Sequence, residues 1–183
     1  MNVLRGGDGN DTITFAFGAR NTVEGGSGND TIKADSTNSS GLANTIIGGT
    51  GNDTITAGQA ADTFMFNRGD GIDTLLDHGG SSDKLVFGAG ISQSDLVYSR
   101  VGDSLVIDVT DPSNALASDQ ITIQKWFTQG FSAGLYPYQI EQIVFENGST
   151  VLASEASTLS NRAALSSVSF IEIIGISEYE SVL

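Results

Sequence analysis

The chain has 183 residues, a formal net charge of −14 and no cysteine. This length suits one domain or two small ones, and the negative charge argues against nucleic acid and anionic membrane surfaces as electrostatic partners. Without cysteine there can be no disulfide and no thiolate metal site, and without a long apolar run we expect no transmembrane segment.

One phrase occurs three times in the first third of the chain, beginning at Gly6, Gly25 and Gly48, and it reads Gly-Gly-x-Gly-Asn-Asp-Thr-Ile. Repetition at near-constant spacing is typical of architectures in which each repeat stacks on its neighbours. The glycines permit turn conformations that other residues avoid, and Asn and Asp tolerate the same conformations while presenting oxygen atoms. A flexible Gly/Asp linker is the alternative, but a linker has no reason to keep Ile in phase.

Less regular copies alternate with the regular ones. A fourth regular copy, here called a good copy like the first three, occupies residues 68–75. The less regular copies, here called blurred copies, end at Asn21, Asn44, Asp62 and Asp83. The first part of the chain therefore contains eight turns, four of each kind. A regular alternation of two kinds of turn indicates that the two kinds occupy different places in the fold.

The repeated phrase resembles the nonapeptide of the haemolysin-type, or RTX, family, Gly-Gly-x-Gly-x-Asp-x-apolar-x. The resemblance implies an all-β fold, a right-handed parallel β-roll (β-solenoid) of about four coils, with two nonapeptides in each coil. It also implies that successive turns fall on opposite edges of the roll. We therefore expect the good turns to stack on one edge, here called the first edge, and the blurred turns to stack on the second edge.

Four stacked turns leave three gaps, and we expect one Ca²⁺ in each, because calcium takes six to eight oxygen ligands in flexible geometry. The resemblance implies that each turn contributes backbone carbonyls and its Asp carboxylate. The predicted metal-site residues are Gly6, Gly7, Asp8, Gly9, Asn10, Asp11, Gly25, Gly26, Ser27, Gly28, Asn29, Asp30, Gly48, Gly49, Thr50, Gly51, Asn52, Asp53, Arg68, Asp70, Gly71 and Asp73. On the second edge, only the gap between Asp62 and Asp83 is a candidate for a fourth, weaker site.

Within the turns, we interpret the side chains of Asp8 and Asp70 as solvated charges. The apolar residue after each turn should line the core in two stacks, one on each sheet. These stacks are Ile13, Ile32, Ile55 and Leu75 on one sheet, and Val23, Ile46, Phe64 and Leu85 on the other. This core is thin, and the stacked carboxylates repel one another without a cation, so we expect the repeats to be largely disordered without calcium.

From about residue 87 the phrase stops and longer strands begin. Residues 95–100 and 104–109 flank a Val-Gly-Asp turn and predict a hairpin, and residues 139–145 and 149–151 flank a second turn. The order of these segments resembles the block that follows the last repeats in RTX proteins. Because an open roll ends in an unpaired edge, we interpret this block as a β-rich cap. Trp126 and Phe127 are predicted to lie in its core, with carbohydrate stacking as the alternative.

These observations divide the chain into a calcium-binding β-roll (1–86), a β-rich cap (87–152) and a C-terminal tail (153–183). Because Met1 opens almost directly onto a repeat, we expect the chain to be part of a longer protein. The tail ends in an acidic and then an apolar segment, which resembles some type I secretion signals, with a last strand or helix on the cap as the alternative.

The resemblance implies a calcium-binding module that folds after type I secretion from a Gram-negative bacterium, with calcium ions and the secretion machinery as its partners. With one His and no Cys, we find no catalytic constellation and predict that the chain itself is not an enzyme. Two alternatives remain open. One is an adhesin-type module that binds a glycan, a protein or a host surface, and the other is a module of a polysaccharide-modifying enzyme.

Overall fold

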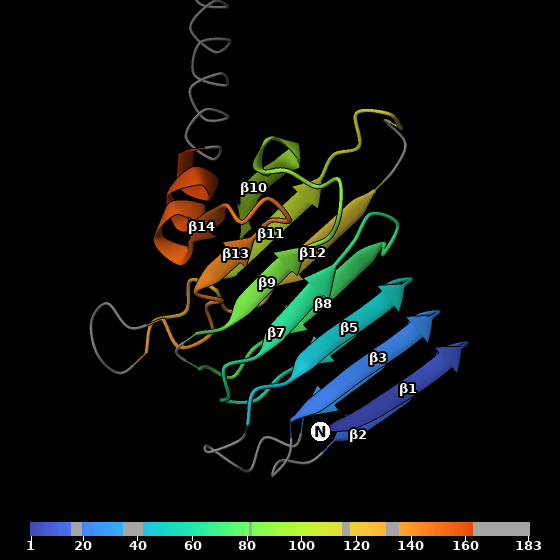
Figure 1. The fold of residues 1–183 in the computed structure, drawn as a ribbon. Helices are drawn as coiled ribbons and strands as arrows, with labels where there is room; N and C mark the ends of the chain where they lie inside the picture. Colours follow the sequence, from blue (N-terminus) through green and yellow to red (C-terminus); the bar gives the residue numbers. More distant parts are fainter. Residues whose placement is uncertain (16–19, 35–41, 81, 115–117, 131–135, 163–183) are drawn as a thin grey trace, which may run out of the picture.

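A computed structural model describes residues 1–15, 20–34, 42–80, 82–114, 118–130 and 136–162. The chain winds between two seven-stranded sheets that face each other (Figure 1). One sheet contains, in spatial order, β1 (Asn2–Asp8), β3 (Asn21–Ser27), β5 (Thr45–Thr50), β7 (Thr63–Phe66), β9 (Lys84–Phe87), β13 (Gln142–Val144) and β14 (Thr150–Leu152). The other contains β10 (Leu96–Val101), β11 (Ser104–Val109), β12 (Asp119–Ile123), β8 (Ile72–Leu76), β6 (Thr54–Thr56), β4 (Thr31–Ala34) and β2 (Thr12–Phe15).

Strands β1 to β9 form the predicted parallel β-roll of about four coils. Odd-numbered strands pair in parallel on one sheet and even-numbered strands pair in parallel on the other. Each coil crosses from the first sheet to the second through a good turn and returns through a blurred one. The predicted alternation of two kinds of turn on two edges is therefore confirmed.

The roll has a single apolar interior, built by residues that alternate inward along each short strand. Ile13, Ile32, Ile55 and Leu75 stand opposite one another in consecutive strands of one sheet. In the facing sheet, Val23, Ile46, Phe64 and Leu85 are paired in the same way. All eight are buried, so both predicted stacks are confirmed.

The cap does not plug the roll but extends both of its sheets. Strand β12 pairs in parallel with β8, and β13 pairs in parallel with β9. The two predicted hairpins are present as β10–β11 and β13–β14, both antiparallel. The exposed strand edges that the last coil would leave are thus occupied on both sheets (Figure 1).

Residues 153–162 are helical and pack on the cap through the buried Ala156 and Ser160. Trp126 is fully buried, and its indole Nε1 donates to Ser157 Oγ at 2.8 Å. The core role predicted for Trp126 is therefore confirmed. The acidic and apolar end of the predicted tail lies outside the described residues. Within the described part of the chain, no helix is both long and apolar enough to cross a membrane.

A short 3₁₀ helix, η1 (Gln93–Asp95), connects the roll to β10. Its Asp95 carboxylate accepts from Arg68 Nη2 at 3.1 Å, and the same guanidinium donates to the carbonyls of Gly90 and Thr110. Arg68 belongs to the fourth good turn, so this half-buried ion pair fastens the roll to the cap on the first edge.

Candidate metal centre

The good turns adopt a backbone that only glycine accepts without strain. The second and third glycines of each of the first three turns have positive φ, for example 108° at Gly7 and 103° at Gly49. The fourth turn keeps this pattern at Gly69 and Gly71. The repeated glycines are thus explained by conformation, and this conformation stacks turn upon turn on the first edge.

A ladder of carboxylates runs through this stack. The backbone N–H of Asp11 donates to Asp30 Oδ1, that of Asp30 to Asp53 Oδ1, and that of Asp53 to Asp73 Oδ1, at 2.7–2.8 Å. Each carboxylate therefore uses one oxygen to hold the turn that precedes it. Asp30, Asp53 and Asp73 are almost completely buried.

In the first three good turns, the second oxygen of the Asp carboxylate has no hydrogen-bond partner. Asp11 Oδ2, Asp30 Oδ2 and Asp53 Oδ2 are buried and accept no hydrogen bond. A buried charged oxygen without a partner is costly. Three such atoms in register along one edge are therefore evidence of cation-binding sites between the turns.

In the first three good turns, the first glycine leaves the space beside these oxygens open. A Cβ added to Gly6 would lie 2.7 Å from Asp11 Oδ2 and 2.5 Å from the Gly25 carbonyl oxygen. At Gly25 a Cβ would overlap Asp30 Oδ2 and the Gly48 carbonyl oxygen. A carboxylate oxygen and the carbonyl of the next turn thus face the same point, which suits a hard cation that prefers oxygen ligands.

Among the described residues, no three Asp, Glu or His side chains form a preassembled metal-ligand cluster. A cation in these gaps would therefore take most of its ligands from backbone carbonyls. Because the turns are rich in glycine, no side chains shield these carbonyls. The donor set is made only of oxygen atoms, as calcium requires.

The asparagines before the carboxylates form a second, exposed ladder in the opposite direction. Asn10 Oδ1 accepts from the backbone N–H of Asn29, and Asn29 Oδ1 accepts from that of Asn52. Asn52 Oδ1 accepts in turn from the backbone N–H of Ile72. The structure thus uses these predicted site residues to join neighbouring turns.

The fourth turn departs from the other three. Asp70 is 5% exposed and accepts from the backbone N–H of Asn67 at 2.7 Å, so its interpretation as a solvated charge is wrong. Asp8 is exposed, as predicted, and accepts from Ser27 Oγ. The cap reaches this turn through Asp119, whose carboxylate accepts from the backbone N–H groups of Gly69 and Gly71.

The second edge carries its own ladder, in which amides replace carboxylates in the first coils. Asn44 Oδ1 accepts from the N–H of Asn21, Asp62 Oδ1 from that of Asn44, and Asp83 Oδ1 from that of Asp62. The ladder ends on the cap, where Glu141 Oε2 accepts from the N–H of Asp83 at 2.7 Å. Asp62 Oδ2 and Asp83 Oδ2 are buried without partners, as expected for the predicted fourth site.

Three acidic residues near these turns were not among the predicted site residues. Asp119 and Glu141 lie on the cap, and each occurs at the start of a strand-forming segment. Asp77 follows β8 and is fully buried. It continues the inward alternation of Asp73 and Leu75, so an acidic residue at an inward position was the signal available in the sequence.

Burial raises the pKa of the carboxyl groups in the later turns of both edges, including Asp53 on the first edge and Asp62 on the second. The pKa of Asp73 rises to about 7 and that of Asp70 to about 6; burial is the largest cause in both, with neighbouring carboxylates adding to it. On the second edge, burial raises the pKa of Asp83 to about 7 and that of Asp77 to about 9.

These shifts predict opposite effects of pH on the two forms of the protein. A raised folded-state pKa contributes stability that is fully present below about pH 4 and is lost as pH rises through the folded-state values. The calcium-free chain should therefore gain β-sheet as pH falls from 8 to 5.

Calcium must displace these protons, so its half-saturating concentration should rise about tenfold per pH unit for each proton displaced. Circular dichroism in calcium-free buffer and calcium titrations at both pH values check this, and a pH-independent midpoint would contradict it.

Together, the two stacked edges and the unpartnered carboxylate oxygens define a calcium-binding β-roll. The family model of the RTX calcium-binding nonapeptide repeat (4 copies) matches residues 2–20, 15–38 and 39–75. That of the haemolysin-type calcium binding protein related domain matches residues 102–154. The chain therefore belongs to the RTX calcium-binding repeat proteins, with the repeats in its roll and the related domain in its cap.

Individual relatives agree with this assignment. The chain is 33% identical over 89 residues to the iron-regulated protein FrpA of Neisseria meningitidis serogroup C, covering 47% of this chain and 7% of that protein. Among solved structures, the AlgE6R2 subunit of the Azotobacter vinelandii mannuronan C5-epimerase matches with a TM-score of 0.51 and 23% identity. This match covers 65% of this chain and 81% of that one, and it shows the β-roll fold.

Proposed function

We propose that this chain is a module that folds when calcium binds and thereby helps a larger secreted protein to fold outside the cell. The observation that carries the proposal is the row of buried, unpartnered oxygens at Asp11, Asp30 and Asp53. Because these oxygens lack partners, the folded roll is disfavoured without a cation. Each ion that binds only the folded chain stabilises it further.

We propose three calcium ions in the gaps of the first edge and a fourth between Asp62 and Asp83. Asp11, Asp30, Asp53 and Asp73 are the proposed carboxylate ligands, and carbonyls of the glycine-rich turns are the proposed backbone ligands. Bound calcium supplies positive charge to the stacked carboxylates. Within the chain, the carboxylate ladder aligns the turns, and the positive-φ glycines let the carbonyls of adjacent turns approach one another.

Export by a type I secretion system is part of the proposal. RTX repeat proteins are typically secreted, and cytosolic calcium is too low to saturate sites with dissociation constants of about 10⁻⁴–10⁻³ M, which are typical of extracellular modules. The chain would then leave the cell unfolded and fold at extracellular calcium. We propose no catalytic role for the chain itself.

The test is far-UV circular dichroism of the purified chain in chelator, followed by a calcium titration. We expect a disordered spectrum that changes cooperatively to β-sheet as calcium is added. Magnesium should be inactive, because it demands a tighter octahedral site and gives up its water reluctantly. A full β-sheet spectrum in chelator would show that cap and core suffice for folding, and the proposal of a folding switch would be lost.

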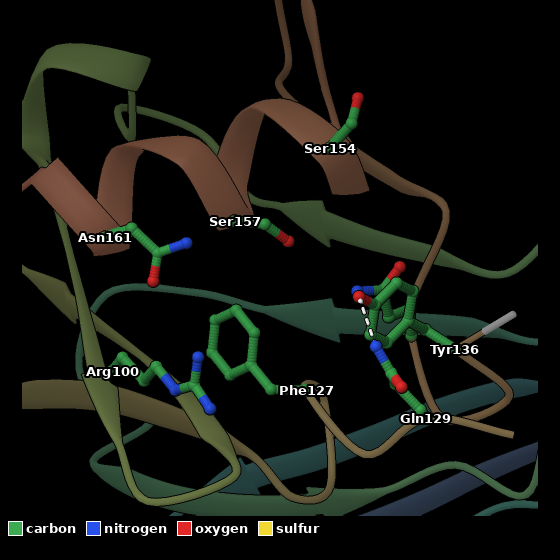
Figure 2. A pocket seen from close by; sticks show the side chains of 8 residues that line it. Arg100, Phe127, Gln129, Tyr136, Ser154, Ser157 and Asn161 are labelled. Carbon is green, nitrogen blue, oxygen red and sulfur yellow. Dashed lines mark hydrogen bonds between the residues drawn. The ribbon is translucent and has the colours of Figure 1, made fainter. Parts of the chain in front are cut away.

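A glycan-binding module is the second candidate, favoured by one pocket on the cap. This pocket has a volume of about 600 Å³. Figure 2 shows Arg100 against Phe127 on one side of it and helical residues such as Asn161 on the opposite wall. The Arg100 guanidinium carbon lies 4.2 Å from the centre of the Phe127 ring. Trp126 is buried and cannot stack on a sugar. A glycan array probed with the calcium-loaded chain and with Phe127→Ala separates the two candidates.

A further inference from the structure

Asp77 occupies a position that is apolar in every earlier coil. Strands β2 and β4 end with the paired inward residues Phe15 and Ala34. The next coil has the buried Ala57 there, one residue beyond the Thr56–Leu76 pair that joins β6 to β8. In the last coil the same position holds Asp77, which is 0% exposed. A carboxylate thus replaces a core residue only in the coil that meets the cap.

Only one of the two oxygens of the Asp77 carboxylate has a hydrogen-bond partner. Its Oδ2 accepts from the backbone N–H of Gly79 at 2.8 Å, whereas its Oδ1 is buried and has no partner. None of the ion pairs among the described residues involves Asp77. The charges that most affect Asp77 are those of Asp83, Asp62 and Glu141, all of which are negative. Burial and these neighbours raise its pKa to about 9, which is a large cost for an ionised group without a cation.

The neighbouring oxygens also lack partners. Asp62 Oδ2 and Asp83 Oδ2 are buried without hydrogen bonds, and both residues are 0% exposed. A Cβ added to Gly80 would overlap Asp83 Oδ2 and lie 2.8 Å from the Ala60 carbonyl oxygen. An open space beside Gly80 is therefore faced by a carboxylate of one turn and a carbonyl of the turn before it, whereas on the first edge the carbonyl comes from the turn that follows.

The cap closes this cluster from the other side. The backbone carbonyl of Pro137 lies where a side chain at Gly79 would be, 2.8 Å from its added Cβ. Glu141 continues the ladder by accepting from the N–H of Asp83, and its side chain also interacts with the Asp83 carboxyl group. Two acidic groups in such contact need a proton or a cation between them. The segment around residues 137–141 therefore takes the place of a further turn.

We propose that Asp77 and Asp83, with the Ala60 carbonyl, bind a divalent cation of the hard, oxygen-preferring class at the junction of roll and cap, and that Glu141 is a positioning residue for Asp83. This inference rests on the proposed calcium function and reverses the predicted order of affinities. Ligand charge strengthens calcium binding, and this site offers unpartnered oxygens of two carboxylates, Asp77 and Asp83, where each first-edge gap offers one. The fourth site is therefore the tightest, and its ion couples docking of the cap to formation of the roll.

The test is a calorimetric titration of the full chain with calcium chloride, comparing the original chain with Asp77→Asn. We expect the variant to lose the tightest binding step, with that site weakened about tenfold or more, while the weaker steps remain. Asp77→Ala is a second variant, because Ala34 and Ala57 show that the fold accepts alanine at this position. Glu146→Gln, at an exposed position of the β13–β14 turn, is the control for the loss of one negative charge and should leave every step unchanged.

Asp53→Asn distinguishes the two edges, since it should weaken a first-edge step and leave the tightest step in place. Retention of the tightest step in both Asp77 variants would overturn the assignment. Failure of Asp77→Ala to fold at saturating calcium would overturn it too, because a purely structural role would then explain the residue. If the original chain itself binds no calcium, the proposed function fails, and this result is distinct from the failure of the Asp77 assignment.

Discussion

A chain that ends after Phe87 is expected to remain disordered at calcium concentrations that fold the full chain. The truncation removes β12 and β13, which cover the open edges of β8 and β9. It also removes Asp119 and Glu141, which bind the backbone of the last turn on each edge. The repeats keep their proposed calcium ligands on the first edge but lose the surface on which the last coil packs.

The measurement is a calcium titration followed by far-UV circular dichroism, up to concentrations at least tenfold above the midpoint of the full chain. A chain that ends at residue 162 is the control, because it retains every described strand and the helical residues that pack on the cap. If the shorter chain folds at the same midpoint as this control, the cap does not contribute to folding of the roll.

Substitution of Gly49 by alanine is expected to disrupt the stack of turns far more than the same substitution at Gly7. Both glycines hold the second position of a good turn, with φ of 103° and 108°. At Gly49 an added Cβ would overlap the carbonyl group of Gly26, whereas at Gly7 it would meet no atom within 4 Å. The pair therefore separates the clash between turns from the backbone strain that both variants share.

The shared strain should cost roughly 1–3 kcal/mol in either variant. The overlap at Gly49 cannot be relieved by a rotamer change, since the atom it meets belongs to the backbone, and we expect a total loss of roughly 3–5 kcal/mol there. Urea unfolding at saturating calcium measures both losses. Equal losses at Gly7 and Gly49 would contradict the close stacking of turns on which the proposed calcium sites depend.

The fold was predictable from sequence because every copy of the repeat carries the same structural information. The same glycines, the same Asp and the same apolar residue recur in phase, and each has one physical role: a positive-φ turn, a ladder acceptor or a core residue. Alternation of good and blurred copies was enough to assign each turn to an edge. The two core stacks followed from the position of the apolar residue after each turn.

The junction with the cap was less predictable, because there the repeat rule no longer applies. Asp70 follows the consensus, yet it turns inward to Asn67 and does not face solvent. Arg68 stands where the other good turns have glycine, and its side chain binds the cap. Asp119 and Glu141 come close to the turns only through the pairing of β12 and β13 with the roll, and no local pattern in the sequence specifies that pairing.

The direction of the carboxylate ladder has a consequence for how such a fold can grow. Each Asp accepts from the turn that precedes it, so every turn is fastened by its C-terminal neighbour, and Asp73 and Glu141 hold the last links. At the opposite end, β1 and β2 are edge strands, and Gly7 and Gly9 have open space beside them. The roll can thus be extended at one end only, because a further coil could be added before β1 without any change to the cap. The number of repeats therefore sets the length of the roll, and the cap separately sets where it ends.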